Sequence, residues 1–519
     1  MGQMSTYRRA LVVALGVLWA TGAAAAAAPA QGSSVDEACA ALSPTALTCT
    51  AAAKVGGAVA AQCRRLGVPT SACTVPIGPQ VAAGATAAYL QSWTHRAAQF
   101  QVGLGDTLPL RQAQWLGTHN SFNSAGNDPP TVSNLDSNQQ LSLAQQLDID
   151  MRSLELDLHD SGGGGAVLVC HGRGADELHV GCTTERPLAA VLPEIAGWLD
   201  QPSHRHEVIL LYLENALGTD AGFAQAVQQL DAGLRRADGS SLLYRPSPAQ
   251  VGTAACAPMP LATTRDDIRA AGAQVMLVGN CRARWSTVVF GWDATHVESG
   301  STPDYKPFPA CDAVYPRSVY DARLVRYFED STLVATVVDP TQSPALQRQR
   351  SLTPAAVGAM TRCGVGLLGM DQILPDDGRI DASIWSWAPD KPAVADGACT
   401  VQRADSRWTT RPCAQHRPVA CRVGAGWAVT PAPVPFTGAS GACTAIGGTP
   451  ALPRTGYENA LLRQAAGEAE VWLAHRTTAR RAAHHARPRT PRRARHRQRA
   501  RARPSSGRQD VTHGPWTGR

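Results

Sequence analysis

Short apolar runs alternate with longer amphipathic stretches between about residues 96 and 377. The short runs are typical of buried strands, and the amphipathic stretches are typical of helices. Strands are predicted over 112–117, 152–159, 166–171, 207–215, 274–280, 286–292, 332–338 and 364–372. Helices are predicted over 141–148, 187–201, 221–236 and 354–360. This alternation indicates an α/β protein and predicts an irregular TIM (β/α)8 barrel over residues 96–377.

One connection departs from a regular barrel. Only residues 160–165, DSGGGG, separate the second predicted strand from the third. That length is too short for the crossover helix that two parallel strands need. Either the barrel is irregular there, or the two strands meet as a hairpin near its rim.

The flanking segments have a different composition. Residues 31–95 are rich in alanine, hold four cysteines and are expected to form a small helical segment. Residues 378–475 are rich in Trp, Pro and Cys and are expected to form a small, loop-rich β module. Residues 476–519 hold 14 arginines and one acid, so this tail accounts for the net charge of +7 and the rest is acidic. The tail is predicted to be disordered, or to result from a frameshift, and nucleic acid is not expected as a partner.

The first 30 residues have the layout of a secretory signal peptide. Arg8 and Arg9 precede an apolar, alanine-rich stretch, and small residues at 28–30 offer a cleavage site. A membrane anchor is the alternative. The 14 cysteines are an even number without a CxxC pair, which favours disulfides of a secreted protein over zinc. Proximity suggests the pairs Cys39–Cys49, Cys63–Cys73, Cys170–Cys182, Cys256–Cys281 and Cys399–Cys413.

The second predicted strand carries a candidate for chemistry. Because side chains alternate along a strand, Leu154, Leu156 and Leu158 share one face. Glu155 and Asp157 then share the other face, and inside a barrel two such acids need a cation or a proton nearby. The ordinary alternative is a solvated strand face with two surface acids.

Three further predicted strands end in polar residues. His119-Asn120 follow the first strand, His171 ends the third, and Glu214 closes the fourth. Each alone has an ordinary interpretation as a loop residue, a core histidine or a helix cap. In a parallel barrel, however, the carboxyl ends of the strands meet at one face. Three carboxylates and an amide oxygen there suit Ca²⁺, and two histidines suit proton transfer near neutral pH.

The motifs THN, ELD, CHG and LEN, in this order and spacing, resemble the X half of phosphoinositide-specific phospholipase C. The likeness is greatest to the bacterial calcium-dependent branch of the PLC-like phosphodiesterase superfamily. It implies that His119 and His171 are catalytic, and that Glu155 helps to deprotonate the attacking inositol hydroxyl. It also implies that four residues bind Ca²⁺: Asn120, Glu155, Asp157 and Glu214. The implied substrate is a phosphatidylinositol-type lipid at a membrane surface, cleaved to diacylglycerol and a cyclic or inositol phosphate.

Two alternatives stay open at this point. A related barrel enzyme could act on a sphingolipid or a glycerophosphodiester. A non-catalytic surface-binding protein could act through its C-terminal module, which resembles the closing half of a C-type lectin domain. Thr409-Thr410 follow Trp408 where the sugar-binding calcium motif needs Asn-Asp. This argues against calcium-dependent sugar binding and leaves a weak glycan contact as the remaining option.

Overall fold

The computed structural model describes residues 81–124, 126, 137–160, 166–170, 186–251, 256–280, 282–292, 296–297, 311–329 and 352–477. Several predictions fall outside these ranges: the signal peptide, residues 31–80, the strand over 332–338 and the tail from 478 onward. None of the described helices combines the length and the apolar character needed to cross a bilayer.

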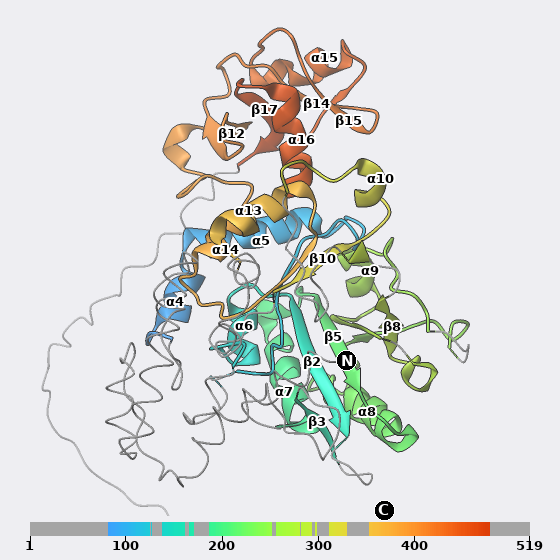
Figure 1. Cartoon of the computed structure of the whole chain (residues 1–519). Coiled ribbons are helices and arrows are strands. Elements are labelled where there is room, and N and C mark those ends of the chain that lie inside the picture. The colour runs from blue at the N-terminus through green and yellow to red at the C-terminus, as the bar shows by residue number, and fades with distance from the viewer. Residues whose placement is uncertain are drawn as a thin grey trace, which may run out of the picture. The chain divides into compact units, whose positions relative to one another are not determined.

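The described residues form one 11-stranded sheet, and eight of its nine parallel strands make up the barrel (Figure 1). They are β1 (Trp115–Thr118), β2 (Ser153–Asp160), β5 (Ile209–Ala216), β7 (Val275–Gly279), β8 (Val289–Gly291), β9 (His296–Val297), β10 (Val325–Phe328) and β11 (Leu367–Met370). Neighbours follow chain order, and β11 returns to pair with β1. Within the described residues no pairing joins β8 to β9, so the predicted (β/α)8 barrel is confirmed in an irregular, incompletely closed form. The short β6 (Leu243–Tyr244) pairs with the start of β7.

The short connection after β2 is a hairpin. β3 (Val167–Val169) runs antiparallel to β2, with Leu158 opposite Val169, and β4 (Arg186–Pro187) pairs with β3 in turn. The third predicted strand is therefore an added antiparallel strand, and its carboxyl end does not point to the same end as those of its parallel neighbours. Of the two options that the sequence left open, the hairpin is confirmed.

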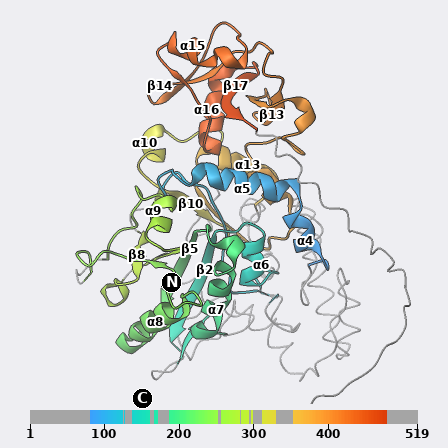
Figure 2. The ribbon, with the colours of Figure 1, turned by 180° about the vertical axis from the view of Figure 1, so that it is seen from behind.

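Helices pack against the outer face of the sheet (Figure 2). The four predicted helices are present as α6 (Leu143–Asp148), α7 (Leu188–Leu199), α8 (Asp220–Gly233) and α13 (Pro354–Cys363). The remaining described α-helices are α4 (Ala85–Leu90), α5 (Trp93–Gly105), α9 (Arg265–Ala270), α10 (Arg317–Tyr320), α14 (Gly378–Ser383), α15 (Ala439–Thr444) and α16 (Gly456–Ala466). The three leucines of β2 are fully buried in one apolar cluster with residues of these helices, as alternation predicted. The opposite face of β2 is thereby left for the barrel interior.

Side-chain caps explain where several helices begin. The Ser142 hydroxyl accepts a hydrogen bond from the Gln145 N–H, and the Gln145 side chain accepts one from the Ser142 N–H, which completes a capping box at α6. Thr219 caps α8 in the same position, and Thr353 caps α13 just before Pro354. These caps fix the residue at which each loop ends and the following helix begins.

Strand β10 was not predicted from the sequence, because Arg326 interrupts its apolar run. The structure buries Arg326, with its guanidinium 4.2 Å from the ring centre of Trp292. A charged residue can occupy a barrel strand here because an aromatic face covers it.

The C-terminal module consists of two small antiparallel sheets, as the predicted β character requires. One has the order β13-β12-β17, from β12 (Cys399–Gln402), β13 (Trp408–Arg411) and β17 (Val471–Arg476). The other has the order β15-β14-β16, from β14 (Ala420–Val423), β15 (Gly426–Val429) and β16 (Thr449–Pro450). The lectin likeness of this module stays a prediction.

Helix α5 connects this module to the barrel. The Phe100 ring lies 5.5 Å from that of Trp387, and the Gln101 side-chain oxygen accepts hydrogen bonds from the N–H groups of Trp385 and Ser386. Because α5 leads into β1, these contacts attach the module to the barrel.

Disulfides were predicted in part. Cys399–Cys413 is confirmed, whereas Cys311–Cys363 and Cys421–Cys443 were not predicted. Cys170 and Cys256 are both disulfide-bonded. Their predicted partners, Cys182 and Cys281, lie outside the described residues.

Candidate active site and metal centre

Strands β2 and β5 bring three carboxylates together. Glu155 and Asp157 point to the barrel interior from β2, and the parallel register places Asp157 beside Glu214 of β5. One oxygen from each of the three carboxylates lies within 4.8 Å of the other two. The three acids that the sequence proposed as metal ligands are therefore adjacent in space.

Asn120 joins this group through the turn after β1. Its backbone adopts a left-handed conformation, with φ of 43°, and its N–H donates to Glu155 Oε2 at 3.1 Å. The Ser121 hydroxyl fixes the same turn by accepting the Glu155 N–H at 2.8 Å. Asn120 Oδ1 is buried and accepts no hydrogen bond from the described residues. An amide oxygen in that condition, on a residue whose backbone contacts Glu155, fits the ligand set of a hard divalent cation such as Ca²⁺.

The electrostatics of Glu155 agree with a cation at this position. Burial raises the pKa of Glu155 to about 8, and the charges of Asp157 and Glu214 add to the rise. His119 and the Asn120 N–H act in the opposite direction without cancelling it. Closely spaced buried carboxylates repel one another, so a bound divalent cation would stabilise all three in their charged form.

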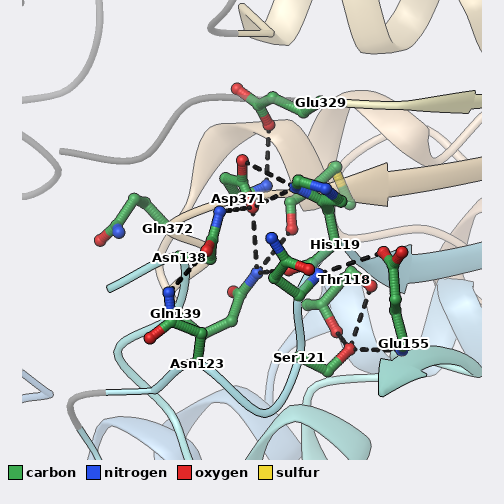
Figure 3. Close-up of polar contacts among 12 residues, drawn as sticks. Thr118, His119, Ser121, Asn123, Asn138, Gln139, Glu155, Glu329, Asp371 and Gln372 are labelled. Atoms are coloured by element: carbon green, nitrogen blue, oxygen red, sulfur yellow. Dashed lines mark hydrogen bonds and ion pairs between the residues drawn. The ribbon is translucent and has the colours of Figure 1, made fainter. Parts of the chain in front are cut away.

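His119 is held from the other side by Asp371, directly after β11 (Figure 3). His119 Nδ1 lies 3.2 and 3.3 Å from the two oxygens of Asp371, a side chain with no solvent exposure. The carboxylate favours the tautomer with its proton on Nδ1 and orients the ring. It also stabilises the imidazolium, so that Nε2 can act as an acid or a charge donor.

Amide side chains fix Asp371 in turn. Asn138 Nδ2 donates to Asp371 Oδ1 at 3.1 Å, and Gln139 Nε2 donates to the carbonyl of His119 at 2.7 Å and that of Met370 at 2.9 Å. Figure 3 shows these side chains meeting between the ends of β1 and β11. Hydrogen bonds from Gln139 thus connect the ends of β1 and β11 next to His119.

Sequence reasoning missed Asp371, Asn138 and Gln139. Asp371 had the same signal as Glu214, an acid at the end of a buried strand, and could have been found by it. Asn138 and Gln139 lie in a polar stretch without any periodic pattern, and only the fold gives them a role.

His171, the second proposed catalytic histidine, lies outside the described residues. Its neighbour Cys170 is described, and the Cys170 N–H donates to the carbonyl of Asp157 at 2.9 Å. The argument that His171 ends a parallel strand was wrong, because β3 is antiparallel. The hairpin nevertheless places Cys170, the residue before His171, in contact with the backbone of Asp157.

Comparison with known proteins assigns the barrel to a family. A family model described as the Rv2075c PI-PLC-like domain matches residues 74–377. The chain belongs to this family. Two relatives from Mycobacterium tuberculosis, named Uncharacterized protein Rv2075c (strain H37Rv) and Uncharacterized protein MT2135 (strain CDC 1551), are each 55% identical over 437 residues. That match covers 83% of this chain and 89% of each relative, so the likeness extends beyond the PI-PLC-like domain.

Solved structures of more distant proteins match part of this chain. Phosphatidylinositol-specific phospholipase C from Listeria monocytogenes is 18% identical with a TM-score of 0.37, covering 56% of this chain and 97% of that one. A Ca²⁺-dependent phosphatidylinositol-specific phospholipase C from Streptomyces antibioticus is 16% identical with a TM-score of 0.28, covering 53% and 97%.

Proposed function

We propose that this protein is a secreted, calcium-dependent phosphodiesterase that cleaves phosphatidylinositol-type phospholipids to diacylglycerol and a cyclic or inositol phosphate. The proposal rests above all on the three carboxylates of Glu155, Asp157 and Glu214, because one oxygen of each lies within 4.8 Å of the other two. Membership of the PI-PLC-like family supports the reaction class. The partner would be the surface of a phospholipid membrane.

In this proposal Asn120, Glu155, Asp157 and Glu214 hold the cation. Ca²⁺, when bound, would offset the charge of the phosphate and lower the pKa of the attacking inositol hydroxyl. Glu155 accepts the proton of the inositol 2-hydroxyl as the oxygen of that hydroxyl bonds to phosphorus. His119, oriented by Asp371, stabilises the charge on the phosphoryl oxygens. His171 donates a proton to the glycerol oxygen as the bond between that oxygen and phosphorus breaks.

Secretion is supported by the disulfides of the described residues together with the predicted signal peptide over 1–30. The mass of the mature protein recovered from culture medium tests it. A mass that still includes residues 1–30 would contradict the predicted cleavage.

The reaction is tested on vesicles that contain phosphatidylinositol, phosphatidylcholine and sphingomyelin. Release of inositol phosphate and of choline is measured while Ca²⁺ is titrated, and then again after addition of a chelator. We expect inositol phosphate alone, lost on chelation and restored by Ca²⁺. Release of choline would favour another phosphodiester, and turnover that ignores the chelator would contradict the ligand assignment. A His119→Ala variant serves as the inactive control.

A further inference from the structure

A buried charged network lies next to the Asp371–His119 pair and is not used by the reaction proposed above. Glu329 follows β10, and its side chain is 1% exposed. One of its oxygens accepts the Asp371 N–H at 2.9 Å, and the other accepts the Leu352 N–H at 2.7 Å. Arg379 of α14, whose side chain is 5% exposed, donates from Nη1 to Glu329 Oε2 at 2.9 Å.

Arg379 also holds the backbone that carries Asp371. Its Nη2 donates to the carbonyls of Asp371 and Gln372 at 2.8 and 3.1 Å, and both Nη2 and Nε donate to the Asp377 carboxylate. Gln372 has a φ of 51°, a left-handed conformation that a non-glycine residue needs contacts to maintain. Its N–H donates to the carbonyl of Asn138 at 2.7 Å. The turn at Asp371–Gln372 is therefore held from one side by Arg379 and from the other by Asn138.

We propose that Arg379 and Glu329 are positioning residues that orient His119 through Asp371. Together they bind the N–H and the C=O of Asp371, and so fix where its carboxylate meets the imidazole. A displacement of about 1 Å in a reacting group can cost about 100-fold in rate. The inference rests on the proposed function for its kinetic consequence, and on geometry alone for its effect on the histidine.

A purely structural role is the competing explanation, and the chain offers a matched control for it. Arg152, just before β2, is 4% exposed at its side chain and donates to Glu207 at 2.7 Å. It also donates to the carbonyls of Leu147 and Met151, at 2.7 and 3.1 Å. Arg152 and Arg379 thus have similar burial and similar partners, but Arg152 lies just before the amino end of β2, whereas Arg379 binds the backbone of Asp371.

The experiment compares Arg379→Met, Arg379→Lys and Arg152→Met in the full-length protein. Each variant is assayed for kcat and KM on phosphatidylinositol vesicles with Ca²⁺, for melting temperature, and for the proton NMR signal of the His119 imidazole Nδ1–H at fixed pH. The His119→Ala variant identifies that signal. We expect both methionine variants to lose stability, and Arg379→Met alone to lose at least about 10-fold in kcat with little change in KM. Arg379→Lys should recover part of the loss, because an ammonium can serve only some of these acceptors.

The NMR signal separates failure of this inference from failure of the proposed function. If the wild-type protein cleaves no lipid, the proposed function fails. A His119 signal that shifts in Arg379→Met but not in Arg152→Met still supports the positioning role. An unchanged signal in Arg379→Met, or equal kcat in the two methionine variants, would overturn it.

Should Arg379→Met not fold, Glu329→Gln takes its place. It keeps the shape and one acceptor but removes the charge paired with Arg379, so a shifted His119 signal is again expected. An unchanged signal in a folded Glu329→Gln protein would likewise overturn the inference.

Discussion

Asp157 of β2 lies directly beside Glu214 of β5 in the parallel register of the barrel sheet. Glu155, two residues before Asp157, faces the same interior, and the three carboxylates converge. Such a group is unfavourable in a buried position without a compensating positive charge. The cation proposed above would supply that charge.

Calcium binding should therefore depend on these carboxylates. Asp157→Asn and Glu214→Gln each remove one negative charge from the ligand set with little change in shape. We expect each to weaken Ca²⁺ binding at least about 10-fold, measured by titration calorimetry. Bound calcium should also stabilise the wild-type fold, by about 2.7 kcal/mol at a concentration 100 times the Kd.

The control for calcium binding is Asp231→Asn on α8, a half-exposed carboxylate that pairs with Arg235. It should bind calcium like the wild type. Equal affinity in the control and in both site variants would place the ion elsewhere or nowhere.

Asp371 should matter for turnover rather than for substrate binding. In Asp371→Asn the histidine loses the charge that favours its Nδ1–H tautomer and its imidazolium form. We expect kcat to fall by about 100- to 10,000-fold with a much smaller change in KM, measured by release of inositol phosphate. Asp148→Asn is the control, because the Asp148 carboxylate at the end of α6 accepts a hydrogen bond from Trp198 of α7. Comparable kcat values in the two variants would remove Asp371 from the catalytic group.

The side chains that face the barrel interior were predictable where the alternation within a single strand determines them. The alternation in residues 152–160 predicted correctly that Leu154 faces the helices and Glu155 the interior, because a strand has a period of two. That His119 and Glu214 both act on Glu155 followed from the rule that the carboxyl ends of parallel strands meet.

The parts that the sequence did not reveal depend on long-range pairing. Asp371 is separated from His119 by 252 residues, and only the pairing of β11 with β1 brings them together. Strand β10 was missed because the burial of Arg326 depends on Trp292, a residue from another part of the barrel. The periodicity of a single segment predicts neither the pairing of β11 with β1 nor the contact of Arg326 with Trp292.

Gly369 should tolerate no side chain. A Cβ atom there would lie 2.3 Å from Cδ1 of Phe328, a buried ring whose centre is 6.3 Å from that of His119. Gly369→Ala is expected to lower the free energy of unfolding by about 1–3 kcal/mol, measured by urea denaturation, and to reduce turnover by moving Phe328. The double variant with Phe328→Leu should recover part of the stability, because the smaller side chain makes room.

Gly103→Ala is the matched control for that substitution. A Cβ at Gly103 meets no atom within 4 Å, and the residue lies inside α5. Alanine in a helix should leave stability unchanged or raise it by up to about 1 kcal/mol. A Gly369→Ala protein as stable as Gly103→Ala would show that Phe328 moves aside without cost.

Glu207 should make the fold sensitive to acid. Burial opposes its ionisation, but the charge and hydrogen bond of Arg152 outweigh burial and hold the pKa of Glu207 below its ordinary value of 4.5. A carboxylate with a lowered pKa in the folded state contributes stability above its unfolded pKa, and this contribution is lost as the pH falls through the folded value.

Glu207→Gln leaves Arg152 buried beside a neutral partner at every pH. We therefore expect the variant to be less stable than the wild type by about 3 kcal/mol at pH 7, and the difference to shrink as the pH falls below 4.5. Denaturant titrations of both proteins between neutral and acid pH measure it. A difference that stays constant with pH would mean that the ionised Glu207 does not stabilise the fold through Arg152.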